Sequence, residues 1–152
     1  MFEKILYPTD FSDVSKKALA YIKNLRNTGT KQVIILRVIN KSKAERISQG
    51  VAWAGVEVAD FLKETYQKLG EEAYEEVKPI ESELKETGFE VKIRVVKGIP
   101  YSKILEVEQE EDVSAIVLGS HGRSNLSDML LGSVSNHVIR HSKKPVLVIK
   151  RE

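Results

Sequence analysis

The residues with the clearest chemical potential lie in a glycine-bearing loop over residues 119–135. Its glycines follow the spacing G-x2-G-x9-G-S, with Gly119 and Gly122 at the start and Gly132 and Ser133 at the end. Glycine lets a backbone approach a ligand closely and adopt positive φ, which turns amide groups toward one point. Gly132 and Ser133 also open an expected helix, whose first amides attract anions. The spacing therefore predicts a phosphate site; glycines that only turn the chain are the alternative.

Two further positions follow the first two expected strands. Asp10 comes shortly after the apolar run 5–7. Its carboxylate can accept a hydrogen bond from a ribose hydroxyl or coordinate Mg²⁺ beside phosphates; an aspartate that merely caps a turn is the alternative. Val38 ends the second strand and can present backbone groups to an adenine edge, or it can be an ordinary buried valine.

Other signatures of nucleotide or catalytic sites are missing. The chain has no G-x4-G-K-[ST] and no G-x-G-x-x-G after the first strand, which argues against a P-loop and a usual dinucleotide fold. The string at 119–122 is not G-x-S-x-G, so a hydrolase elbow is disfavoured. Because there is no cysteine, thiolate catalysis and iron–sulfur clusters are excluded.

Charge and hydropathy narrow the class of partner. The formal net charge is +2, and only the basic stretch 140–151 favours nucleic acid as a partner, which makes such binding unlikely on sequence grounds. No apolar run reaches the roughly 20 residues of a membrane-spanning helix. The N-terminal residues lack the pattern of a signal peptide. We therefore expect a cytoplasmic protein that does not bind membranes.

Apolar periodicity predicts an alternation of strands and helices over one domain, 1–152. The expected strands are 5–7, 33–39, 90–97, 113–118 and 145–149, and the expected helices are 14–25, 59–87, 100–110 and 133–141. Residues 40–58 carry a poor signal and are expected to form a mobile crossover or a short helix. Near-continuous apolar strands that alternate with helices favour an α/β fold, a parallel sheet covered on both faces. Ligands of such sheets lie beyond the carboxyl ends of the strands.

The chain resembles the universal stress protein family over essentially its whole length. The resemblance rests on residues 6–12 (LYPTDFS), 36–39 (LRVI), 98–100 (GIP) and 144–149 (KPVLVI), and is strongest at 119–122 with 131–134. The complete G-x2-G-x9-G-[ST] motif is typical of the ATP-binding branch of this family. The resemblance implies a three-layer, Rossmann-like fold, similar to the adenine nucleotide alpha hydrolases, with five parallel strands in the order 3-2-1-4-5.

The resemblance also implies residue roles. Asp10 would lie near ribose and a metal ion, Mg²⁺ or Mn²⁺, and Val38 would contact adenine through its backbone. The expected nucleotide site comprises Pro8, Thr9, Asp10, Val38, Leu118, Gly119, Ser120, His121, Gly122, Arg123, Gly132, Ser133, Val134 and Ser135. The expected ligand is ATP, or AMP or ADP, and no residue is expected to be catalytic.

Two functions fit this site. In the first, ATP binding changes the surface that a protein partner meets, so the chain is a nucleotide-dependent switch in a stress response. In the second, the chain is a slow ATPase or a phosphate-transferring enzyme; the sequence offers no clear general base for it. A homodimer is implied by the family and supported by the apolar strand 146–149, an edge in that strand order that a second copy could pair.

Overall fold

A computed structural model describes residues 1–52, 57–120 and 131–151. Five parallel strands form one sheet in the order β3-β2-β1-β4-β5. The strands are β1 Lys4–Pro8, β2 Gln32–Asn40, β3 Glu90–Gly98, β4 Ala115–Gly119 and β5 Val146–Ile149. The helices are α1 Asp13–Leu25, α2 Lys41–Ala52, α3 Val58–Glu86, α4 Pro100–Glu110 and α5 Ser133–His141, with a 3-10 turn η1 Arg26–Thr28 after α1. The predicted fold class and strand order are confirmed.

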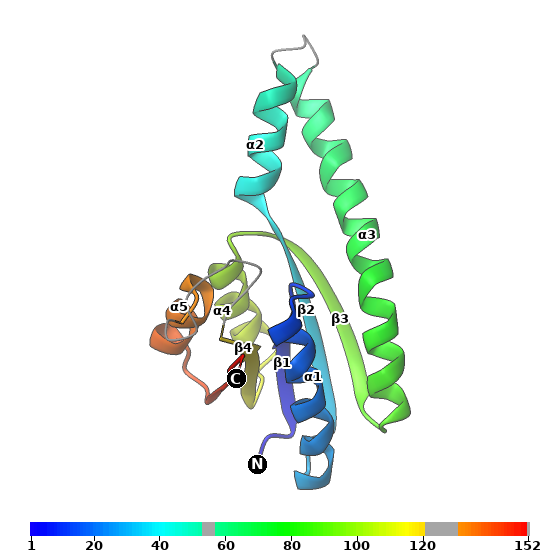
Figure 1. Cartoon of the computed structure of the whole chain (residues 1–152), viewed down its shortest axis with the longest axis vertical. Coiled ribbons are helices and arrows are strands. Elements are labelled where there is room, and N and C mark those ends of the chain that lie inside the picture. Colours follow the sequence, from blue (N-terminus) through cyan, green and yellow to red (C-terminus); the bar gives the residue numbers. More distant parts are fainter. Residues whose placement is uncertain (53–56, 121–130, 152) are drawn as a thin grey trace.

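Helices cover both faces of the sheet, because alternate strand residues point to opposite sides. One apolar cluster joins Ile5, Tyr7, Ile35 and Val117 to α1 and α3. The other joins Leu6, Ile34, Leu36, Val38, Ile116 and Leu118 to α4 and α5. Figure 1 shows the resulting arrangement, with α1 and α3 on one side of the sheet and α4 and α5 on the other.

The helices α2 and α3 extend beyond the sheet (Figure 1). The segment 40–58 is helical over α2, so the short helix was the correct one of the two expected alternatives. The buried residues of α3, Ala73, Val77, Ile80 and Leu84, all lie in its C-terminal half, which packs on the sheet. None of the helices in the described part of the chain carries an apolar stretch sufficient to span a lipid bilayer.

Strand β5 forms one edge of the sheet and is apolar. The amides of Ile116 and Ser120 donate hydrogen bonds to the carbonyl oxygens of Pro145 (2.9 Å) and Ile149 (2.8 Å). Because alternate residues of a parallel strand direct their backbone groups to opposite neighbours, Val146 and Val148 direct theirs away from β4. The side chain of Leu147, in the same strand, is exposed.

Candidate functional site

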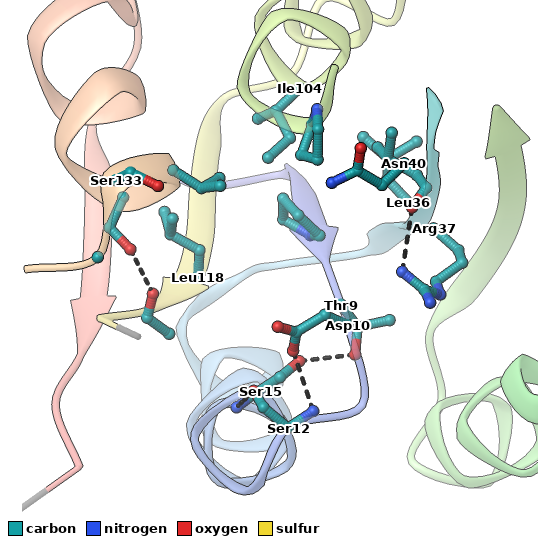
Figure 2. A pocket seen from close by; sticks show the side chains of 17 residues that line it. Thr9, Asp10, Ser12, Ser15, Leu36, Arg37, Asn40, Ile104, Leu118 and Ser133 are labelled. Atoms are coloured by element: carbon teal, nitrogen blue, oxygen red, sulfur yellow. Dashed lines mark hydrogen bonds between the residues drawn. The ribbon is translucent and has the colours of Figure 1, made fainter. Parts of the chain in front are cut away.

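A cavity of about 310 Å³ lies where the carboxyl ends of β1, β2 and β4 meet α4 and α5. This is the switch point of the strand order, because β1 connects outward to β2 while β4 lies on its other side. Figure 2 shows the lining side chains converging from these elements. The volume lies within the range of small-molecule sites.

The cavity brings together most of the predicted site residues. Those that line it are Pro8, Thr9, Asp10, Val38, Leu118, Gly119, Gly132, Ser133, Val134 and Ser135. Ser120 is buried beside the cavity rather than in its wall; its carbonyl oxygen accepts a hydrogen bond of 2.7 Å from the Gly132 amide. The predicted residues His121, Gly122 and Arg123 lie outside the described residues.

One end of the cavity is apolar and suits a planar base. Its walls come from β2, α4 and β4, with Leu36, Val38, Pro100, Ile104 and Leu118. The Thr9 amide donates to the Leu36 carbonyl oxygen at 2.9 Å, which is where β1 leaves β2. By the alternation of a parallel strand, the backbone groups of Val38 face the same side, where β1 has ended. They are therefore directed into the cavity.

The turn between β1 and α1 is held by a buried network of hydroxyl groups. Ser15 Oγ donates to Thr9 Oγ1 at 2.6 Å, and Tyr7 Oη donates to the Ser15 carbonyl oxygen at 2.7 Å. Burial is the main reason why the pKa of Tyr7 is raised, so this phenol remains a donor. Asp10 Oδ1 accepts a hydrogen bond of 2.9 Å from the Ser12 amide. The bond from the Ser12 amide holds the Asp10 carboxylate in the turn that lines the cavity.

The other end of the cavity is the N-terminus of α5. Gly132 is its N-cap, with φ −63° and ψ 158°, and Ser133 begins the helix. The amides of the first helical turn have no acceptor within the helix, and the helix dipole adds positive charge there. Ser135 Oγ donates to the carbonyl oxygens of Gly119 (2.7 Å) and Ser120 (3.0 Å), which fixes the helix to the end of β4. This end of the cavity suits an anion.

Gly119 lines the cavity and also packs closely against α1. A Cβ atom built on Gly119 would lie 2.8 Å from Val14 Cγ1, on α1. Such a contact is shorter than side chains tolerate. The glycine therefore lets α1 approach β4, in addition to lining the cavity.

Seven lining residues were not predicted from the sequence. They are Ser12, Ser15, Leu36, Arg37, Asn40, Pro100 and Ile104. Ser12 is the N-cap of α1, and its Oγ accepts a hydrogen bond of 3.2 Å from the Ser15 amide. Pro100 and Ile104 come from α4, whose position over β2 is a tertiary contact. The preceding Gly98-Ile99-Pro100 string was the available signal for this wall.

Comparison with known proteins identifies the family. The model of the universal stress protein family matches residues 1–150. The universal stress protein MJ0577 of Methanocaldococcus jannaschii is 41% identical, over 100% of this chain and 97% of that protein. Its solved structure aligns with a TM-score of 0.86 over 98% of its chain.

More distant structures share the fold. The solved protein PH0823 is 34% identical and aligns with a TM-score of 0.80 over 100% of this chain and 98% of its own. A universal stress protein in complex with cAMP (23% identity, TM-score 0.66, 99% of this chain and 98% of that chain) and one from Archaeoglobus fulgidus in complex with dAMP (21%, 0.62, 99% and 98%) show the same architecture. This chain belongs to the universal stress protein family.

Proposed function

We propose that the chain binds an adenine nucleotide, ATP in particular, in the cavity at the switch point of the sheet. The observation that carries the proposal is the polarity of the cavity. An apolar end with the backbone of Val38 suits the base, and the N-terminus of α5 at Ser133 suits phosphates. Asp10 lies between them and suits the ribose hydroxyls.

The relatives add support for this class of ligand. Two structures of the same fold are complexes with cAMP and dAMP, both of which carry adenine, a sugar and one phosphate. A cavity that binds adenine, a sugar and a phosphate in line needs an apolar end, a polar middle and an anion-binding end. ATP needs the same three surfaces. We therefore expect AMP and ADP to bind as well, with ATP favoured by its additional charge at α5.

A divalent cation, Mg²⁺ or Mn²⁺, would accompany the phosphates. Asp10 is the carboxylate among the described lining residues, and one of its oxygens already accepts from the Ser12 amide. The described residues contain no group of three or more potential metal ligands. Mg²⁺ usually takes one or two carboxylates and completes its shell with phosphate and water, which fits this site. Asp10 would hold such an ion only together with the nucleotide.

We infer that the bound nucleotide acts as a switch in a stress response, rather than as a substrate. Among the described lining residues there is no histidine or lysine beside the α5 end to act on a phosphate. Turnover with saturating Mg-ATP tests the alternative, a slow ATPase or phosphate-transferring enzyme. Conversion of one ATP per site within seconds would favour that enzyme.

The protein is further proposed to form a homodimer through β5. Val146 and Val148 direct their backbone groups to the open edge, and Leu147 is exposed beside them. An open apolar edge favours pairing with a second strand. Antiparallel pairing about a two-fold axis would satisfy both edges.

Calorimetry and mass spectrometry test the proposed ligand. The freshly purified protein is expected to release an adenine nucleotide on denaturation, and the nucleotide-free protein is expected to bind ATP with saturation. Ser133→Asp, which adds negative charge at the phosphate end, is expected to weaken ATP while leaving adenosine binding unchanged. Absence of saturable ATP binding up to millimolar concentration would contradict the proposal.

A further inference from the structure

Arg37 lies at the apolar end of the cavity, called here the base end, and is held there by β2 and by the turn after β1. Arg37 Nη1 donates to the Val38 carbonyl oxygen at 3.0 Å, and the guanidinium carbon lies 5.3 Å from the centroid of the Phe11 ring. Phe11 belongs to the turn after β1 and has φ 62°. Figure 2 shows the Arg37 side chain below Leu36 and Asn40, beside the cavity. The cationic donor thus lies at the backbone group that a base would read.

Asn40 adds a second donor at the same end. Its Oδ1 accepts a hydrogen bond of 3.0 Å from the Ser42 amide, at the start of α2. With the oxygen used in this way, the amide nitrogen is directed toward the cavity (Figure 2). The side chains at the base end therefore offer donors, and the Val38 carbonyl oxygen already accepts from one of them.

This donor pattern has a consequence for the base. Adenine presents an amino group at C6, which is a donor, whereas guanine and hypoxanthine present a carbonyl group, which is an acceptor. Arginine has donors only and stays charged at every physiological pH. An adenine amino group can donate to the second lone pair of the Val38 carbonyl oxygen, but it cannot accept from Arg37 or Asn40. A C6 carbonyl group instead accepts from Arg37 or Asn40, while the N1–H beside it donates to Val38.

We propose that Arg37 is a specificity-determining residue and that it makes the site accept 6-oxopurine nucleotides, those of guanine and hypoxanthine, alongside adenine nucleotides. The inference rests on the proposed nucleotide function and concerns the base end alone. The phosphate end at α5 is the same for either base.

Isothermal titration calorimetry with ATP and ITP tests this assignment, because the two ligands differ only along the C6–N1 edge of the base. In the wild type, ITP is expected to bind within about tenfold of ATP. In Arg37→Ala, the ratio of the ITP to the ATP dissociation constant is expected to rise about tenfold, since one good base contact is lost for ITP only. GTP is expected to follow ITP.

Two further variants keep the test decisive. Arg37→Met keeps the apolar stem beside Phe11 without a donor, and it is expected to change the ratio as Arg37→Ala does. Arg46→Ala removes an exposed arginine of α2 that does not line the cavity, and it is expected to leave the ratio unchanged. Melting temperatures identify any variant that does not fold.

The outcomes separate this inference from the proposed function. If Arg37→Met changes ATP and ITP affinity by the same factor, Arg37 does not read the base and the inference is wrong. If the wild type binds ATP but rejects ITP and GTP more than a thousandfold, it is wrong as well. If the wild type binds neither ATP nor ITP, the proposed function itself fails.

Discussion

The hydroxyl group of Ser135, in the first turn of α5, donates a hydrogen bond of 2.7 Å to the carbonyl oxygen of Gly119, the last residue of β4. A second contact of 3.0 Å reaches the Ser120 carbonyl oxygen. This buried side chain ties the start of α5 to the end of β4. The position of the α5 N-terminus at the end of the cavity depends on this tie.

Ser135→Ala is therefore expected to loosen α5 against β4. Because the Gly119 carbonyl oxygen loses the Ser135 hydroxyl and the Ser120 carbonyl oxygen keeps only the Gly132 amide, the free energy of unfolding should fall by about 1–2 kcal/mol, and ATP affinity should fall with it. Chemical denaturation and calorimetry measure the two effects. Ser102→Ala, at an exposed position of α4, is the control and should change neither. Unchanged stability in Ser135→Ala would show that the tie contributes nothing.

Asp10 offers a matched pair of substitutions. Asp10→Asn keeps an oxygen that can accept from the Ser12 amide, whereas Asp10→Ala removes it. Both should weaken Mg-ATP binding by about 1–3 kcal/mol, because the charge beside ribose and metal is lost. Only Asp10→Ala should also lower the melting temperature. If Asp10→Asn binds Mg-ATP as the wild type does, the carboxylate holds neither ribose nor metal.

Gly119→Ala is expected to destabilise the fold by about 1–3 kcal/mol, because its new Cβ would lie 2.8 Å from Val14 Cγ1. The double variant Val14→Ala with Gly119→Ala removes that atom. It should recover part of the loss relative to the sum of the single variants. Thermal unfolding of the wild type, the two single variants and the double variant completes this double-mutant cycle. If the effects of the two substitutions on the free energy of unfolding are strictly additive, the two side chains do not clash.

Two proline substitutions in β5 are expected to have different effects, because the amides that they remove point to opposite sides of the strand. Val148→Pro removes an amide that points away from β4, so it should split a dimer while leaving the fold intact. Leu147→Pro removes an amide that points toward β4 and should lower stability instead. Sedimentation at micromolar concentration, with Val148→Thr as the control, measures the assembly. A wild type that sediments as a single 17.1 kDa species contradicts the dimer.

The pH dependence of stability has an identifiable contributor in Glu111. Hydrogen bonding to Lys92 is the main reason why the pKa of Glu111 lies below its ordinary value, and the charge of Arg94 adds to it. A lowered pKa in the folded protein means stability that is complete above the unfolded pKa and lost as pH falls through the folded one. Glu111→Gln should therefore cost about 0.5–1 kcal/mol at pH 7. The difference from the wild type should vanish in acid; a constant difference would exclude this ion pair as its cause.

The sequence predicted the strands and the start of α5 at Ser133 because both depend on local pattern. Strand β4 was expected at 113–118 and begins at Ala115, since Val113 is buried without pairing in the ladder. The wall formed by Ile104 could not be predicted, because an apolar helix face does not reveal which strand end it covers. The packing of Gly119 against Val14 could not be predicted for the same reason, since Val14 lies more than a hundred residues earlier in the chain.

The two edges of the sheet differ in a way that limits assembly. Strand β3, at the edge opposite β5, carries Lys92, Arg94 and Lys97, and charged side chains discourage a further strand from adding there. If two copies join at β5, as proposed, both of the outer strands that remain are β3. The joined sheet then has no end at which a third copy can add. In such a dimer, growth into a fibre would be discouraged by the same strand order that forms the cavity.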